Sequence, residues 1–134
     1  MYATLDIEIL DLFNGNMEFI KNGACPTYVK RGRTVQLLKS MALPTGILND
    51  VDLVVYDYDL NDGDILVMCT DGVIDSNKEY VNKQLWLRYL LEDIEVNDAQ
   101  KIADIIIAEA IDNDYGKQKD AMSVIVDKIT KKLK

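Results

Sequence analysis

Two aspartates stand beside apolar segments of the kind that form buried strands. Asp71 follows the apolar run Ile65–Cys69 and precedes Gly72, and Asp120 stands shortly before the apolar run Met122–Val126. If these two strands are neighbours, both carboxylates reach one end of one sheet, where like charges require a cation or a shared proton. Carboxylate oxygens suit Mg²⁺ or Mn²⁺ as ligands. The pattern therefore indicates a metal site, although Asp-Gly pairs are also ordinary turn formers.

The composition excludes several other chemistries. The 134 residues contain no histidine, which rules out Ser-His-Asp and Cys-His catalysis and histidine zinc sites. Cys25 and Cys69 lack a metal-ligand spacing, so we expect buried free thiols in a reducing compartment. A net charge of −8 argues against a nucleic-acid partner, and no apolar run approaches the ~20 residues that span a bilayer. We therefore expect a soluble, cytoplasmic chain.

The first half of the chain has the patterns of strands and tight turns. Residues 4–9 alternate apolar and acidic side chains, which predicts a strand with one buried face, formed by Leu5, Ile7 and Ile9. Further strands are expected over residues 17–21, 27–29, 34–38, 52–59 and 65–69. Turns are expected between them, at Asn14-Gly15, Arg31-Gly32, Leu43-Pro44-Thr45-Gly46 and Asn61-Asp62-Gly63.

After Asp75 the apolar period becomes helical. Ser76 or Asn77 is expected to cap a helix whose apolar stripe consists of Val81, Leu85, Trp86, Tyr89 and Leu90. A second helix is expected to begin at Asn97, with Gln100 reaching back to complete the cap, and to bury Ile102, Ile105, Ile106 and Ala110. Gly116 then breaks the helical pattern before the final strand. This order of elements predicts an α+β fold with a largely antiparallel sheet.

Four separated segments resemble one protein family. They read "YATLDIEILDLFNGNMEFIKNGACPTYVKRG", "ALPTGILNDVD", "LNDGDILVMCTDGVID" and "DAMSVIV". In order and spacing they are similar to the phosphatase domain of the stage II sporulation protein E family, a bacterial branch of the metal-dependent type 2C serine/threonine protein phosphatases. The resemblance runs from Tyr2 to Ile129. It is far more specific than a lone Asp-Gly pair.

The resemblance implies a fold and a set of site residues. The fold is the later part of a four-layer α-β-β-α sandwich with metals at one edge of two packed sheets. In the family, the aspartate of "DGV" and the first aspartate of "DDMT" or "DNMT" ligate one metal, and these positions are Asp71 and Asp120. Asp75 matches the acid that closes the "DGV" motif, and we expect Asp75 and Gly72 to act beside the ligands or through water.

The resemblance also implies a reaction and partners. In the family, a water activated by two Mn²⁺ or Mg²⁺ ions attacks phosphorus in line, so no side chain is expected to be a covalent catalyst. The expected substrate is a phosphorylated anti-sigma factor antagonist, whose dephosphorylation activates a sporulation sigma factor. The full-length relative is membrane-anchored upstream, but no part of residues 1–134 is expected to span a membrane.

The chain departs from the family pattern in three ways. It begins partway into the domain, so we interpret residues 1–134 as a partial phosphatase domain that lacks the "DGMG"-like loop and the first helices. Ala121 stands where the family has Asp or Asn, and Lys119 where an acid often precedes. We therefore expect weak Mn²⁺ binding and little hydrolysis by the fragment alone. The uncovered apolar face at Leu5, Ile7 and Ile9 favours a homodimer or a rearranged sheet edge.

A second hypothesis is a non-catalytic role. In that case the chain is an inactive fragment or an impaired relative that binds a regulator as a protein-binding module. A plain structural fragment is the residual interpretation. Asp71 and Asp120 distinguish the enzyme from both alternatives.

Overall fold

The computed structural model describes residues 5–22, 24–39, 55–114 and 121–131. The elements in chain order are β1 (Leu5–Leu10), β2 (Asn16–Asn22), β3 (Thr27–Arg31), β4 (Thr34–Leu38), β5 (Val55–Asp59), β6 (Ile65–Cys69), α1 (Asp71–Ile74), α2 (Gln84–Asp93), α3 (Ala99–Asn113) and β7 (Val124–Lys128). The predicted α+β class is confirmed. Four predicted features lie outside the described residues: the bend at Leu43-Pro44-Thr45-Gly46, the start of the strand at residues 52–54, Gly116 and Asp120.

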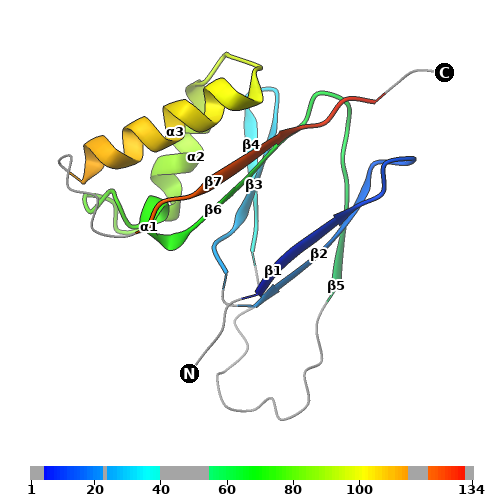
Figure 1. The fold of residues 1–134 in the computed structure, drawn as a ribbon, viewed down its shortest axis with the longest axis horizontal. Coiled ribbons are helices and arrows are strands. Elements are labelled where there is room, and N and C mark those ends of the chain that lie inside the picture. The colour runs from blue at the N-terminus through cyan, green and yellow to red at the C-terminus, as the bar shows by residue number, and fades with distance from the viewer. Residues whose placement is uncertain (1–4, 23, 40–54, 115–120, 132–134) are drawn as a thin grey trace, which may run out of the picture.

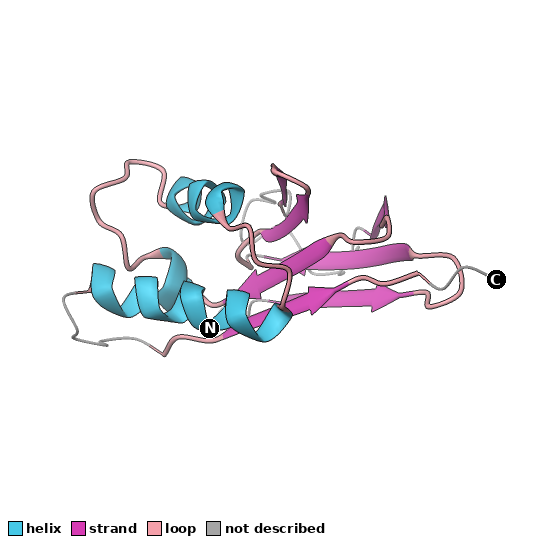
Figure 2. Ribbon diagram, turned by 90° about the horizontal axis from the view of Figure 1, so that it is seen from above, coloured by secondary structure: helices cyan, strands magenta, loops and turns pink. Residues whose placement is uncertain are grey.

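The strands form two antiparallel sheets. The three-stranded sheet has the order β1-β2-β5, and the four-stranded sheet has the order β4-β3-β6-β7. Figure 1 shows the three-stranded sheet on one side of the four-stranded sheet and the helices on the other. In the turned view of Figure 2 the helices likewise lie to one side of the strands. The described part of the chain is therefore layered as sheet, sheet and helices.

Each face of the four-stranded sheet packs into its own core. Alternate residues of β3 and β6 point to opposite faces, as the pleat of a strand requires. Tyr28, Ile65 and Val67 pack against Trp86, Leu87, Leu91 and the buried residues of α3. Between the two sheets lie Met17, Phe19, Val29, Leu38, Leu60, Leu66 and Ile129. β6 thus contributes side chains to both cores, and it is the strand that leads to Asp71.

The alternation predicted for the first strand is present, but its apolar side chains face outward. Ile7 is 40% exposed and Ile9 is 57% exposed. Asp6 and Glu8 point the other way, toward the four-stranded sheet, where Glu8 accepts a hydrogen bond from Thr27. The expectation of a buried Ile7–Ile9 face was therefore wrong for this chain. The further expectation that this apolar face lacks a cover is confirmed for Ile7 and Ile9.

The structure corrects the first predicted helix. A short helix, α1, begins directly at Asp71, and α2 begins only at Gln84 with Lys83 as its N-cap. Ser76 does not cap α2, because its hydroxyl donates a hydrogen bond to the Val73 carbonyl in α1. Asn77 lies seven residues before α2 and instead accepts a hydrogen bond from the backbone of Glu79. Neither predicted cap is correct.

The buried stripe of α2 also differs from the prediction. Val81 lies before the helix and is fully exposed, and Tyr89 is exposed as well. The buried side chains are Trp86, Leu87 and Leu91. The reason is the Trp86 indole, whose N–H donates a 2.9 Å hydrogen bond to the Ile74 carbonyl and so sets the rotation of α2 against α1. That partner lies twelve residues away in sequence.

The second helix agrees better with its prediction. Ile102, Ile106 and Ala110 are buried, and Ile105 packs against the same core. The N-cap is Asp98 rather than Asn97, since the Asp98 carboxylate accepts from the Lys101 backbone N–H at 3.0 Å. The side chain of Gln100 donates to Asp104 instead of reaching back. The final strand begins two residues later than Met122, at Val124.

The predicted turn at Asn14-Gly15 is confirmed and requires glycine. Gly15 has a φ of +76°, a left-handed conformation that glycine adopts without steric cost. Its N–H donates to the Asp11 carbonyl, and its own carbonyl accepts from Leu60. A Cβ built on Gly15 would lie 3.0 Å from the Leu60 carbonyl oxygen and 2.7 Å from the end of the Lys131 side chain.

Gly32 provides a matched comparison for Gly15. It also has a positive φ, +63°, but no atom lies within 4 Å of a Cβ built on it. We expect Gly32→Ala to lower the free energy of unfolding by about 1 kcal/mol through backbone strain alone. Gly15→Ala should cost clearly more, because close approach to Leu60 adds to the same strain. Urea unfolding of both variants measures the difference, and equal losses would contradict this account.

Candidate metal centre

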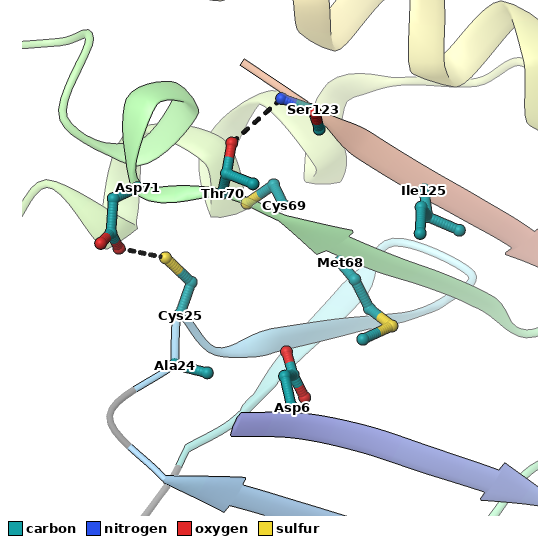
Figure 3. Close-up of a pocket in the computed structure, with 9 residues that line it drawn as sticks. All are labelled: Asp6, Ala24, Cys25, Met68, Cys69, Thr70, Asp71, Ser123 and Ile125. Carbon is teal, nitrogen blue, oxygen red and sulfur yellow. Dashed lines mark hydrogen bonds between the residues drawn. The ribbon is translucent and has the colours of Figure 1, made fainter. Parts of the chain in front are cut away.

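The ends of β6 and β7 lie side by side, as the sequence analysis required. Cys69 pairs with Val124 in the antiparallel register. Beyond the ladder, the Thr70 N–H donates to the Ser123 carbonyl at 3.1 Å, and the Ser123 N–H donates to Thr70 Oγ1 at 3.0 Å (Figure 3). The Thr70 hydroxyl also donates to the Ala121 carbonyl at 3.2 Å. The start of α1 and the approach to β7 are therefore fixed at one edge of the sheet.

Asp71 occupies this edge as the first residue of α1. Thr70 before it is extended, and the next three residues, Gly72 to Ile74, are buried. The Asp71 carbonyl accepts from the Asp75 N–H at 2.8 Å, which closes the single turn. The carboxylate of Asp71 itself is exposed. A buried strand and a buried helical turn thus hold an acid at the surface.

A cavity of about 320 Å³ opens beside Asp71 between the two sheets. Figure 3 shows the carboxylates of Asp6 and Asp71 on opposite sides of the space that also holds both cysteine side chains. The lining residues are Asp6, Ala24, Cys25, Met68, Cys69, Thr70, Asp71, Ser123 and Ile125. The cavity therefore has a mixed lining of carboxylates, hydroxyls, thiols and apolar groups.

Both cysteines are free, as predicted, but neither is fully buried. The Cys25 thiol donates a 2.7 Å hydrogen bond to Asp71 Oδ1. Burial, followed by this hydrogen bond, raises the pKa of Cys25, which keeps the proton on the thiol. Burial likewise raises the pKa of Cys69 to about 12. The two thiols are neutral neighbours of the site rather than thiolate ligands.

A buried lysine lies between the sheets at the cavity end. The side chain of Lys21 is fully buried, with its ammonium 2.8 Å from Asp6 Oδ1 and 3.7 Å from Glu8 Oε1. It also donates to the Cys25 carbonyl at 3.0 Å. Burial is the largest influence on Glu8 and raises its pKa, against the opposing effects of Thr27 and Lys21. The space between the sheets is therefore ionic here and apolar further along.

The predicted site residues have separate outcomes. Asp71 and Gly72 lie where the sequence placed them, at the end of β6. Asp75 is exposed, is 3.9 Å from the Lys83 ammonium, and does not line the cavity. Asp120 and Lys119 lie outside the described residues, so the pairing of Asp71 with Asp120 stays a prediction.

Several residues at the site were missed by sequence reasoning. Asp6, Lys21 and Cys25 belong to elements that the chain brings to this edge only through folding. The single signal in the sequence was a lysine at a position of β2 where the alternation calls for an apolar side chain, after Met17 and Phe19. That signal does not by itself indicate which residue the lysine contacts.

The donors at the cavity fit a hard cation in kind. Asp71 and Asp6 line the cavity with carboxylate oxygens, the ligand type that suits Mg²⁺ or Mn²⁺, and Asp6 Oδ1 is already paired with Lys21. Within the described ranges, however, no group of three or more acidic or sulfur-bearing side chains is placed to hold a metal ion. The described residues therefore provide a fitting but incomplete ligand set.

Comparison with solved structures defines the class of protein. The chain superposes on the phosphatase domain of the cell fate determinant SpoIIE from Bacillus subtilis, presoaked with Mn, with a TM-score of 0.86 and 33% identity. The match covers 99% of the chain and 59% of that structure. The catalytic domain of the serine/threonine protein phosphatase PstP, in complex with two manganese ions, has a TM-score of 0.68 but 15% identity, which shows the fold alone. The fold is that of type 2C phosphatase domains.

Sequence comparison identifies the family. The family described as "Stage II sporulation protein E (SpoIIE)" matches residues 1–130, and the chain belongs to this family. It is 36% identical over 129 residues to the stage II sporulation protein E of Bacillus subtilis and 33% identical to that of Priestia megaterium. These matches cover 96% of the chain but only 16% and 22% of the two relatives.

None of the helices in the described ranges combines the length and apolar character needed to cross a bilayer.

Thr70 provides a test of how the site edge is held together. Its hydroxyl makes two hydrogen bonds to the segment before β7, so Thr70→Ala should lower the free energy of unfolding by about 1–2 kcal/mol. Thr70→Ser keeps the hydroxyl and should stay close to wild type. Urea unfolding measures the stability, and hydrogen exchange at the Ser123 amide reports the local effect. An unchanged Ser123 exchange rate in Thr70→Ala would contradict the assignment.

Proposed function

We propose that the chain is the C-terminal part of a metal-dependent protein serine phosphatase domain. The observation that carries the proposal is the position of Asp71, an exposed carboxylate anchored by buried neighbours at the edge where β6 meets β7. The aspartate of the family's "DGV" motif stands at this position. Membership of the stage II sporulation protein E family and the fold of type 2C phosphatases support the same reaction class.

Chain connectivity supports Asp120 as the partner of Asp71. Asp120 directly precedes Ala121 in the sequence, and the Ala121 carbonyl is hydrogen-bonded to Thr70, the neighbour of Asp71. Consecutive Cα atoms are about 3.8 Å apart, so the covalent chain allows residue 120 only a short distance from Ala121. We propose that Asp71 and Asp120 ligate the same Mn²⁺ or Mg²⁺ ion in a binuclear site. Gly72 and Asp75 would act beside these ligands or through water.

The chain's own residues would then have distinct tasks. When bound, divalent metal ions acidify an attacking water and neutralise the phosphate oxygens. Asp71 holds its carboxylate toward the cavity because Gly72, Val73 and Ile74 are buried behind it. The Cys25 thiol orients one carboxylate oxygen by its hydrogen bond. No histidine or other covalent catalyst is needed in this scheme.

The substrate and partners are inferred from the family alone. We propose a phosphorylated anti-sigma factor antagonist as the substrate, a cytoplasmic location for this portion, and release of a sporulation sigma factor as the outcome. The exposed Ile7–Ile9 face also supports self-association of the isolated chain. Because the chain spans about a fifth or less of its sporulation relatives, these properties belong to the intact protein.

A non-catalytic, protein-binding role is the second candidate. Ala121 favours it, because this position usually carries an acid or an amide in the family. One substitution can separate the two candidates, since a metal ligand is needed for hydrolysis but not for docking.

The isolated chain should bind Mn²⁺ weakly. A hard cation held by few carboxylates keeps most of its waters and dissociates readily. We expect no measurable turnover of a chromogenic phosphomonoester by the 134-residue chain. Calorimetric titration with Mn²⁺ and the phosphatase assay provide the two measurements, and robust turnover by the purified chain would overturn this expectation.

The decisive experiment uses a completed domain, in which the preceding part of the Bacillus subtilis SpoIIE phosphatase domain is joined to this chain. We expect Asp71→Asn to lower Mn²⁺-dependent dephosphorylation of a phosphoserine protein by about 100-fold or more, because even residues that contact metal ligands contribute 10–100-fold. Binding of the phosphorylated protein should persist.

Asp57→Asn is the matched control, since Asp57 is an exposed aspartate of β5 that does not line the cavity. It should leave the rate unchanged. A wild-type domain that binds the phosphoprotein without releasing phosphate would support the binding module instead.

A further inference from the structure

Lys21 is a buried cation whose surroundings differ from those of an ordinary core residue. It belongs to β2 and is only 7% exposed, and its side chain is fully buried. Its ammonium is 2.8 Å from Asp6 and 3.7 Å from Glu8, both on the neighbouring strand β1. Burying a charge is unfavourable unless it is paired and hydrogen-bonded. The two carboxylates satisfy that requirement from within the three-stranded sheet.

The third contact of Lys21 leaves that sheet. Its ammonium donates a 3.0 Å hydrogen bond to the carbonyl of Cys25. Cys25 lies in the connection between β2 of the three-stranded sheet and β3 of the four-stranded sheet. The Lys21 ammonium thereby links the backbone of the connection to the carboxylates of Asp6 and Glu8.

The connection contacts the candidate metal centre through the Cys25 side chain. The thiol donates a 2.7 Å hydrogen bond to Asp71 Oδ1, as Figure 3 shows. Within the described ranges, the Cys25 thiol is the one hydrogen-bond donor to the Asp71 side chain. A continuous series of polar contacts therefore runs from Asp6 through Lys21 and Cys25 to Asp71.

We propose that Lys21 is a positioning residue for the Asp71 carboxylate and acts through the Cys25 segment. The proposal rests on the proposed function, in which Asp71 is a metal ligand. Hydrogen bonds to a ligating carboxylate fix its orientation, and removing such partners typically weakens metal binding 10–100-fold. Lys21 sets where the Cys25 thiol lies, and the thiol sets which oxygen of Asp71 is presented to a cation.

Lys30 shows what a purely structural buried lysine does in the same sandwich. It is 4% exposed, lies on β3, and donates to the Leu91 carbonyl of α2 on the helical side of the sheet. Among the residues that the structure describes, it has no hydrogen bond to the Cys25 connection, and it does not line the cavity. Lys30→Met is therefore a matched control for Lys21→Met, since both remove a buried ammonium from the same pair of sheets.

The test uses NMR of the isotopically labelled 134-residue chain. In the metal-free chain, the chemical shifts of the Asp71 carboxyl carbon and amide report the surroundings of the carboxylate. Broadening of the Asp71 amide signal by added Mn²⁺ reports even weak metal binding. We expect Lys21→Met and Cys25→Ala to shift the Asp71 carboxyl resonance in the same direction. Both should raise the Mn²⁺ dissociation constant about tenfold. Lys30→Met should leave both readouts at their wild-type values.

Two further variants keep the result interpretable. If Lys21→Met does not fold, Lys21→Met combined with Glu8→Gln removes one charge of each sign and carries the same expectation. Asp71→Asn should abolish the broadening at residue 71. A wild-type chain whose broadening by Mn²⁺ does not depend on Asp71 contradicts the proposed function.

The outcome for Lys21 is separable from that result. If the broadening by Mn²⁺ does not depend on Asp71, the proposal for Lys21 is judged from the Asp71 carboxyl resonance of the metal-free chain alone. A folded Lys21 variant with the wild-type Asp71 carboxyl resonance would overturn the proposal. Where Mn²⁺ binding does depend on Asp71, the variant's Mn²⁺ dissociation constant would also have to lie within twofold of the wild-type value.

Discussion

The pairing of β6 with its neighbours is the constraint on which the rest of the structure depends. Ile65 and Val67 pack toward the helices, whereas Leu66 packs toward the three-stranded sheet. A strand held in two cores cannot shift without opening both, because side chains of opposite faces move together. The residues directly after β6, Thr70 and Asp71, are therefore held in place by the strand. Apolar packing thus holds the backbone at the site, whereas the polar contacts of Thr70 and Cys25 hold its edge and the Asp71 side chain.

The space between the sheets changes character along its length. Far from Asp71 it is filled by side chains such as Met17 and Phe19. At the cavity end it holds Lys21 with two carboxylates. Replacing a buried ion pair by well-packed apolar side chains of similar volume often leaves a protein equally stable or more stable. This ionic group contacts the β2–β3 connection beside Asp71, through the Cys25 carbonyl. This coincidence is the physical basis for assigning Lys21 a task at the site.

The exposed side of the three-stranded sheet separates this chain from a closed sandwich. Ile7 and Ile9 face outward, and the chain spans 59% of the matched SpoIIE phosphatase domain structure. An apolar face of this kind requires a cover, either from another part of the same protein or from another copy. The metal centre has the corresponding feature, since its described donors are of the right kind but too few.

The sequence by itself determined the described strands, the turns at Gly15, Gly32 and Gly63, the α+β class, the family, and Asp71 at the end of a buried strand. These features are local: alternation, glycine at a turn and an acid after an apolar run are read within a few residues. Only the tertiary structure decided which way β1 faces, where α2 begins, and which side chains meet at Asp71. Trp86 bonds to Ile74, Lys21 to Asp6 and Cys25, and Cys25 to Asp71, so each depends on contacts between separate elements. Amphipathic patterns give the period of an element, but its rotation and its partners are set by the energy of packing against other elements.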